Sequence, residues 1–426
     1  MASLILDKRI EHPLRRVLTD EVHARPPLGL SAPAVLFHFA WLGDGASETL
    51  AALCRSHGEP GPSPTRRHGL IQQNEGWIKW ECHTEFVTCC FLRPDHGTAE
   101  IWPALPPDVA QFVDMLPGNC LVALILRVAA DAPGAFEAAR LAEIFPSGDL
   151  IGSSIAAGDG MVWTDFRLDP TSFGRILVRN IRMTPGRLGR AVQRLLEVET
   201  YRMMALLGLP LAREISDELG HLEKRLTEIA ARTADTGRHE EDHELLDQLT
   251  RIAAEAAALS ARSRYRFSAT AAYAELVERR LGELREDRID GLSRVSAFLE
   301  RRFHPATSTC ASCVRRMDVL AGSIDQAADM LRTRVDVNLE AQNSNLLRAM
   351  ESRSRTQLRI QEAVEGLSVF AISYYLIALL KILVEGLLPG DFANREHVIA
   401  AIAVPVVLAA VWLGVRRLRR VLKSDH

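Results

Sequence analysis

The chain has 426 residues, a formal net charge of −3 and 25% charged residues. This length allows one large or two modest domains beside a membrane segment, and the near-neutral charge gives no reason to expect a nucleic-acid partner. Seven cysteines, an odd number, predict reduced thiols in the cytoplasm and argue against a disulfide framework.

Residues 1–30 are rich in turn signals, and the opening stretch is too polar to be expected as a signal peptide. His12, Glu21 and His23 are candidates for a metal site or an acid–base pair. No spacing fixes them on one face of an element, and neighbouring Arg and Asp side chains favour a salt-bridged arm instead. We therefore predict no catalytic, cofactor or metal site in this segment.

Short apolar runs rich in Val, Ile, Phe and Trp follow, and their length favours β-strands. Strands are predicted at residues 33–41, 76–81, 85–92, 121–128, 161–166 and 176–183, and helices at 46–56, 107–115 and 134–145. The glycine-rich stretch 148–160 has no Lys-Ser/Thr pair after it, so a loop or hairpin is favoured over a phosphate-binding loop. The mixed order predicts an α/β or α+β cytoplasmic domain over residues 1–185.

Residues 186–313 carry apolar residues at three- and four-residue spacing, which predicts a helical region. Gly208-Leu209-Pro210 and residues 237–243 are predicted to separate its helices, and Pro305 to Ser312 predicts a further turn.

Two cysteine pairs invite a metal or redox interpretation. Cys310 and Cys313 form a single CxxC, but a structural zinc site needs four ligands and no second pair follows. An ordinary turn with two thiols is therefore favoured. Cys89 and Cys90 are adjacent in a predicted strand, so their side chains point to opposite faces.

A long stalk helix is predicted over residues 314–365, running on into an apolar segment. Its apolar residues form a seam, similar to that of a coiled coil, with steps close to three and four: Met317, Leu320, Ile324, Ala328, Leu331, Val335, Leu339, Leu346 and Ala349. Such a seam needs covering, either by the helices of residues 187–303 or by other copies of the chain. The second possibility predicts a homo-oligomer.

Two apolar segments, residues 366–388 and 398–415, are each long enough to cross a lipid bilayer as a helix. The link of about ten residues between them predicts a transmembrane hairpin over residues 366–415. A basic tail, residues 416–426, follows the second segment and predicts a cytoplasmic C-terminus. Two crossings return the chain to one side, so both termini are expected in the cytoplasm of a bacterium, at its inner membrane.

Polar residues mark one face of the first span. Tyr374, Lys381 and Glu385 recur at helical spacing, and they serve either as interfacial anchors or as a pore face. A ring of lysines at an outer mouth would repel divalent cations, which favours anchoring. Basic side chains after the second span are expected to meet anionic headgroups: Arg416, Arg417, Arg419 and Arg420.

Three stretches resemble a family of bacterial membrane-anchored proteins of unknown function: HPLRRVLTDEVHARPP, VDVNLEAQNSNLLRAM and QLRIQEAVEGLSVFAISYY. The resemblance covers essentially the whole chain and implies no particular chemistry. The layout is also similar to that of CorA-type divalent-cation transporters, which implies a cytoplasmic domain, a stalk helix running into the first span, a second span and a basic C-terminus. Their Gly-Met-Asn signature is absent, because Glu385-Gly386-Leu387-Leu388-Pro389-Gly390 stands in its place.

These features predict a membrane-anchored, homo-oligomeric, non-enzymatic protein whose cytoplasmic part senses or binds a ligand. The alternative is an ion channel or transporter of the CorA-like class that lacks the Gly-Met-Asn signature. The chain has no phosphate-binding glycine loop and no GxSxG motif, so an enzyme on a membrane anchor has the least support.

Overall fold

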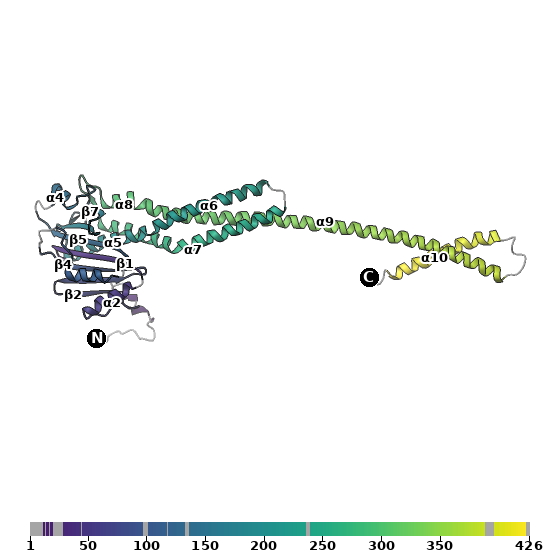
Figure 1. Ribbon diagram of the computed structural model, residues 1–426, viewed down its shortest axis with the longest axis horizontal. Helices are drawn as coiled ribbons and strands as arrows, with labels where there is room; N and C mark the ends of the chain where they lie inside the picture. Colours follow the sequence, from purple (N-terminus) through teal and green to yellow (C-terminus); the bar gives the residue numbers. More distant parts are fainter. Residues whose placement is uncertain are drawn as a thin grey trace, which may run out of the picture. The chain divides into compact units, whose positions relative to one another are not determined.

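The computed structural model describes residues 12, 14–16, 18–19, 29–43, 45–96, 101–116, 118–132, 136–235, 239–387 and 396–422. Contacts group residues 1–235 and 247–328 into one compact unit, and residues 236–246 and 329–426 into a second. Figure 1 labels most of the helices and some of the strands.

Nine strands in the described part of the first unit form one mixed sheet (Figure 1). They are β1 Ala34–Leu42, β2 His68–Gln73, β3 Gly76–Cys82, β4 Phe86–Pro94, β5 Cys120–Ala130, β6 Ile151–Ile155, β7 Gly160–Leu168, β8 Gly174–Asn180 and β9 Asp287–Arg288. Their order is β2-β3-β4-β1-β5-β8-β7-β6-β9. The pair β5–β8 is parallel and the other pairs are antiparallel. The expected mixed architecture is therefore confirmed as α+β.

The six predicted strands correspond to β1, β3, β4, β5, β7 and β8. The glycine-rich stretch forms a hairpin, since β6 pairs antiparallel with β7. Two short strands were not predicted from the sequence. β2 (HGLIQQ) holds few apolar residues, and β9 has only two residues, so neither carries a periodic signal.

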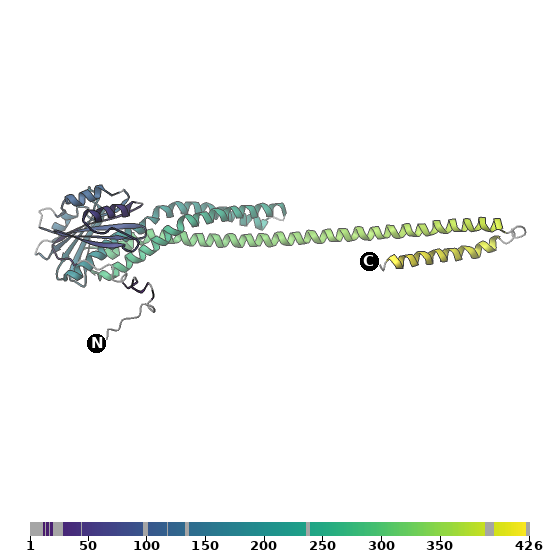
Figure 2. The same ribbon diagram turned by 90° about the horizontal axis from the view of Figure 1, so that it is seen from below.

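Helices cover both faces of the sheet (Figure 2). One face packs against α2 Ala46–Ser56 and α3 Pro107–Asp114, through Leu50, Leu53, Val109 and Phe112. The other packs against α5 Pro185–Leu206, through Leu188, Val192, Leu195 and Leu196. A further short helix, α4 Ala138–Ile144, packs beside Trp163. Because both faces are buried, β1 is almost continuously apolar instead of alternating.

Three long helices follow: α6 Gly208–Asp235, α7 His239–Leu284 and, after α8 Val295–Arg302, α9 His304–Leu387. Within the first unit α6 contacts both of the others. Arg225 of α6 pairs with Glu255 of α7 at 2.6 Å, and Arg316 of α9 pairs with Glu223 of α6 at 2.8 Å. The break predicted at residues 208–210 lies just before them, because α5 ends at Leu206 and α6 already begins at Gly208. Of the break predicted at residues 237–243, residues 239–243 belong to α7 instead, and 237–238 lie outside the described residues.

The turn predicted for residues 305–312 is wrong, because α9 already begins at His304. Pro305 lies in the first turn of α9, where its missing N–H costs no intrahelical hydrogen bond. The hydroxyl groups that suggested a turn bond to the helix backbone instead: Thr307 donates to the His304 carbonyl at 3.0 Å and Thr309 to the Pro305 carbonyl at 2.9 Å.

The second unit holds the rest of α9 and α10 Glu396–Leu422. Among the described residues, one helical stretch, Val295–Leu383, contains an 18-residue window that is long and apolar enough to cross a membrane. Only 6% of that window is buried. The long helix is confirmed, whereas residues 388–395 lie outside the described residues and the hairpin stays a prediction.

The predicted seam divides in two by exposure. Its first part is buried within the chain, with Leu320 and Ile324 each 3% exposed and Leu331 0% exposed. Its second part lies open, with Leu339 51% and Leu346 60% exposed. The chain itself therefore covers the seam only as far as about Leu331.

Candidate functional site

Alternation along β1 directs every second side chain toward α5. Phe37 and Phe39 pack on the α2–α3 face, whereas Leu36 and His38 face α5. The same alternation on β3 and β4 turns Lys79, Glu81, Thr88 and Cys90 toward α5. Polar side chains therefore gather on one patch of an otherwise apolar sheet face.

The strand register joins these residues into two rows. His38 is opposite Cys90, which in turn is opposite Lys79 on the next strand. In the second row Thr88 is opposite Glu81. Directly opposed side chains are the closest neighbours on a sheet face, so the register brings together residues far apart in the sequence.

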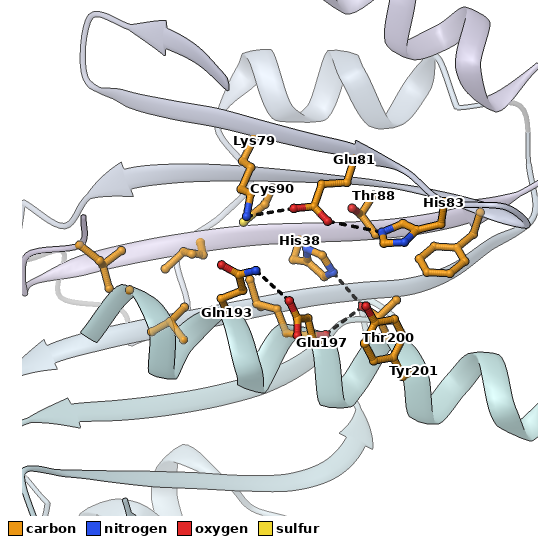
Figure 3. A pocket seen from close by; sticks show the side chains of 16 residues that line it. His38, Lys79, Glu81, His83, Thr88, Cys90, Gln193, Glu197, Thr200 and Tyr201 are labelled. Atoms are coloured by element: carbon orange, nitrogen blue, oxygen red, sulfur yellow. Dashed lines mark hydrogen bonds and ion pairs between the residues drawn. The ribbon is translucent and has the colours of Figure 1, made fainter. Parts of the chain in front are cut away.

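A cavity of about 70 Å³ lies between this patch and α5 (Figure 3). We call it the α5 pocket; its lining residues are Leu30, Leu36, His38, Lys79, Glu81, His83, Phe86, Thr88, Cys90, Gly189, Val192, Gln193, Leu196, Glu197, Thr200 and Tyr201. At roughly 10–15 Å³ per water the pocket has room for about five waters, or for one small organic molecule.

His38 lies at the centre of the α5 pocket and is 5% exposed. Its Nε2 is 3.0 Å from the Thr200 hydroxyl oxygen, and that hydroxyl donates its own proton to the Leu196 carbonyl at 2.9 Å. The hydroxyl must then accept from Nε2–H, which leaves a lone pair on Nδ1. No described residue makes a hydrogen bond to Nδ1, although that atom is buried. Burial lowers the pKa of His38 to about 4, so the ring is neutral at pH 7.

Polar contacts link three side chains on or just after β3: Lys79, Glu81 and His83. Lys79 Nζ is 3.0 Å from Glu81 Oε1, and His83 Nε2 is 3.5 Å from Glu81 Oε2. Burial alone would raise the pKa of Glu81, but the contacts with His83 and Lys79 outweigh it and lower the pKa to about 2. Glu81 is thus a carboxylate at any physiological pH. The His83 ring also stacks on Phe86 with ring centroids 4.2 Å apart, which fixes its position at the edge of the pocket.

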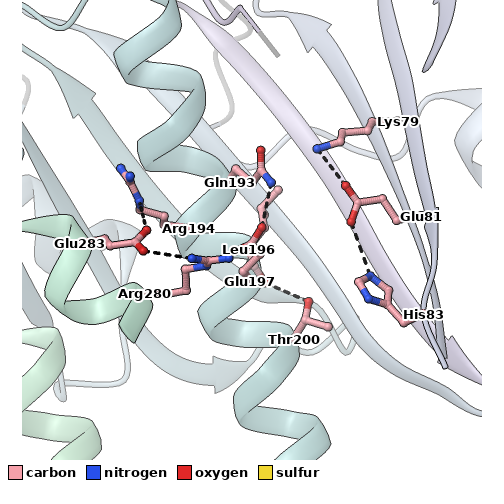
Figure 4. A network of polar contacts seen from close by, with 10 residues as sticks. All are labelled: Lys79, Glu81, His83, Gln193, Arg194, Leu196, Glu197, Thr200, Arg280 and Glu283. Carbon is pink, nitrogen blue, oxygen red and sulfur yellow. Dashed lines mark hydrogen bonds and ion pairs between the residues drawn. The ribbon is translucent and has the colours of Figure 1, made fainter. Parts of the chain in front are cut away.

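The helix side of the pocket carries a second carboxylate, Glu197 (Figure 4). Gln193 Nε2 donates to Glu197 Oε1 at 2.8 Å, and Arg280 of α7 donates to Oε2. Arg280 also donates to Glu283, which accepts from Arg194 at 2.7 Å. The Glu197 charge is therefore balanced by a network outside the cavity.

The α5 pocket is lined by one cysteine, Cys90. Burial raises the pKa of the Cys90 thiol to about 12, so that sulfur is a thiol and a poor nucleophile. Within the described residues, no group of three or more His, Cys, Asp or Glu side chains is arranged to hold a metal ion.

The site residues predicted from the sequence lie elsewhere, on α9 and α10. Tyr374 is 72% exposed and Lys381 is also exposed, both on α9. Arg416 and Arg417 are exposed on α10, with the Arg416 guanidinium 4.9 Å from the centre of the Trp412 ring. Glu385 belongs to helix α9, and Arg419 and Arg420 belong to helix α10. The side chains of these three residues lie outside the described part of the structure. Whether these residues meet a bilayer or a pore stays a prediction.

All four cysteines of the two pairs are buried. Cys310 and Cys313 lie buried on helix α9, so the predicted turn with two thiols is wrong. The Cys313 thiol donates to the Ala212 carbonyl at 3.3 Å, and burial raises the pKa of both sulfurs. Cys89 and Cys90 pack in separate cores on opposite sheet faces, as predicted.

Of the N-terminal candidates for a metal site or an acid–base pair, only His12 is described. Its Nδ1 accepts a hydrogen bond from the Leu14 amide at 3.2 Å. Glu21 and His23 lie outside the described residues.

Sequence reasoning missed the α5 pocket, although two signals were present. A histidine interrupts the apolar run AVLFHFAWL, and Lys79 and Glu81 alternate with apolar residues in GWIKWEC. Each signal marks a polar position on a buried strand, but only the register shows that the three residues share one patch.

A family model described as "Protein of unknown function (DUF3422)" matches residues 10–422. No curated protein matches the chain at a significant level. Among solved structures, one described as "structure of the full-length CmaX protein" is similar at 12% identity and a TM-score of 0.18, over 92% of this chain and 99% of that chain. A TM-score this low supports no conclusion about fold or activity.

Proposed function

The chain belongs to the DUF3422 family of proteins of unknown function, and from its own residues we propose that it is a non-enzymatic, homo-oligomeric protein anchored in the bacterial inner membrane. Residues 366–388 and 398–415 form the anchor, and both termini lie in the cytoplasm. The first unit binds a small ligand in the α5 pocket.

One observation supports the proposed membrane anchor. The apolar window of α9 is only 6% buried, so the described chain does not cover it as it covers the core of a soluble protein. Large side chains along it are open, among them Leu367 at 73% and Phe370 at 70% exposure. An apolar helix of this length is stable in hydrocarbon, where all its backbone groups are satisfied internally.

Basic side chains lie before this stretch and near its far end. Arg353, Arg355 and Arg359 precede it and are exposed, and Lys381 lies toward its far end. Lysine and arginine at such positions extend to the interface, and Arg416 and Arg417 on α10 contact anionic lipid in the same way. The lipid bilayer is thus the principal partner.

Self-association rests on the open part of the seam. Leu339 and Leu346 of the seam, and Met350 beside it, are all more than half exposed on α9. Their spacing puts them on one side of the helix, and burying that side against a second copy removes apolar surface from water. Transport, the alternative function, also requires several copies, because two spans cannot enclose an aqueous path.

Reporter insertion tests the anchor and its orientation together. Alkaline phosphatase, which is active only in the periplasm, is inserted after Pro389 in one strain and fused after His426 in another. We expect activity from the Pro389 insertion alone, because that link lies between the two spans and the basic tail holds the C-terminus inside.

A matched variant shows whether the activity depends on membrane insertion. Leu376→Lys with Leu379→Lys adds two charges to the first span at about 2.5–3.5 kcal/mol each, and should abolish the Pro389 signal. Phosphatase activity from the His426 fusion, or none from either position, would refute the proposed anchor.

A further inference from the structure

Every charged side chain that lines the α5 pocket already has a partner of opposite charge or a hydrogen-bond donor. Lys79 and His83 both pair with Glu81, at 3.0 and 3.5 Å. Glu197 accepts from Gln193 and Arg280. A charged ligand in the pocket would lose its hydration and find no free counter-charge, so the pocket disfavours ions.

Among the fully buried side-chain nitrogen and oxygen atoms of the described lining residues, one has no hydrogen-bond partner, and it belongs to a neutral ring. Nδ1 of His38 is buried without a hydrogen bond, whereas Nε2 is held by Thr200 at 3.0 Å. Since the Thr200 hydroxyl donates to Leu196, Nδ1 presents a lone pair and needs a donor. In Figure 3 the His38 ring lies between Glu81 of β3 and Thr200 of α5, within the ring of lining side chains.

The remaining wall is largely apolar and the space is small. Leu36, Phe86, Val192 and Leu196 line a cavity of about 70 Å³. Such walls favour a compact, mostly apolar molecule, and a buried polar nitrogen left unpaired gives a strong preference for a molecule that can satisfy it.

We propose that the α5 pocket takes a small uncharged ligand whose N–H or O–H group donates a hydrogen bond to Nδ1 of His38. This inference rests on the ligand-binding role of the first unit proposed above and names the class of ligand. His38 acts as the specificity-determining acceptor, and Thr200 is a positioning residue that fixes the tautomer of the ring.

Three five-membered rings of nearly equal size separate the possibilities. Pyrrole carries one N–H donor, furan has no donor, and pyrrolidine is a cation at neutral pH. Each is titrated into the full-length protein in mild detergent and followed by ligand-observed NMR. We expect pyrrole to bind about three- to tenfold more tightly than furan, the usual range for one net hydrogen bond, and pyrrolidine to bind more weakly than pyrrole.

Two variants test whether the preference for pyrrole over furan depends on His38. His38→Phe keeps an aromatic ring but removes Nδ1, so the pyrrole-to-furan affinity ratio should fall to about one. Partition of the probes into detergent is measured with detergent alone. His96→Phe makes the same substitution at an exposed histidine that does not line the pocket, so the wild-type ratio should persist. If His38→Phe does not fold, ¹⁵N-histidine labelling of the wild type replaces it: pyrrole, but not furan, should shift the Nδ1 resonance of His38.

The outcomes separate this inference from the broader proposal. Equal binding of pyrrole and furan to the wild type, or tighter binding of pyrrolidine, would overturn the donor requirement and leave a ligand-binding pocket in place. If none of the three probes binds more to the wild type than to detergent alone, both the ligand class and the ligand-binding role are wrong, while the membrane anchor is unaffected.

Discussion

His38 is a histidine placed where a protonated ring is costly. Burial lowers its pKa from 6.5 to about 4, with a smaller opposing effect from Glu81. In the unfolded chain the ring titrates near its ordinary value, so below pH 6.5 the unfolded state binds more protons than the folded state. The contribution of His38 to stability is therefore complete above pH 6.5 and is lost as the pH falls toward 4.

The folded protein should lose roughly 2 kcal/mol of unfolding free energy between pH 7.5 and pH 5 because of His38. Chemical denaturation of the full-length chain in detergent, followed by tryptophan fluorescence, measures the loss. His38→Phe should flatten the curve over this interval, since the titrating group is gone. Parallel pH curves for wild type and variant would show that His38 is not buried as described.

The sequence indicates that residue 38 lies in a strand, yet not what the side chain meets. β1 is buried on both faces, so no polar–apolar alternation marks which residues face α5. Thr200, the partner of Nε2, is 162 positions away in the chain. Sites built from such distant residues depend on register and helix packing, which a single sequence does not encode in any local pattern.

At the scale of elements, Gly208 is a position where α6 lies close to two other helices. A Cβ at this position would lie 2.3 Å from Thr270 Oγ1 on α7 and 3.2 Å from Cys310 Sγ on α9. Thr270 is buried and donates to the Ala205 carbonyl at 3.0 Å, so it has little freedom to move. The start of α6 is thus packed directly against both neighbouring helices.

Gly208→Ala should lower the unfolding free energy by about 1–3 kcal/mol, the usual effect of overpacking. Gly220→Ala is the matched control: it lies on the same helix with nothing within 4 Å of the added Cβ, and should be neutral or stabilising by about 0.5–1 kcal/mol. Both are measured by thermal unfolding of the purified chain. Equal melting temperatures for the two variants would contradict this packing of α6.

Strands with long apolar runs and helices with clear periodicity were predictable from the sequence, as β1 and α2 illustrate. The start of α9 was not, because Pro305 and the hydroxyl-rich residues after it are equally at home in a turn and in the first turns of a helix. The pairing of β9 with β6 could not be predicted either, because a strand of two residues has no periodic pattern of its own and forms only through the sheet that it joins.

At the scale of the whole molecule, we propose that copies of the membrane-anchored chain associate through α9. The buried part of the seam cannot serve this contact, because Leu331 is already 0% exposed in the single chain. The open part can. Leu339 and Leu346 are seven residues apart and share one side of the helix, whereas Val337 and Leu347 are turned from the mean direction of these two by about 170° and about 90°.

Light scattering of the detergent-solubilised protein tests the proposed assembly most directly. We predict a wild-type mass of at least two chains at micromolar concentration. Leu339→Ala with Leu346→Ala should reduce it toward a single chain, because each buried leucine contributes about 2–5 kcal/mol. Val337→Ala with Leu347→Ala removes equally exposed residues from other sides of α9 and should leave the mass unchanged. A wild-type protein that is monomeric under these conditions would contradict both the homo-oligomer and any pore built from it.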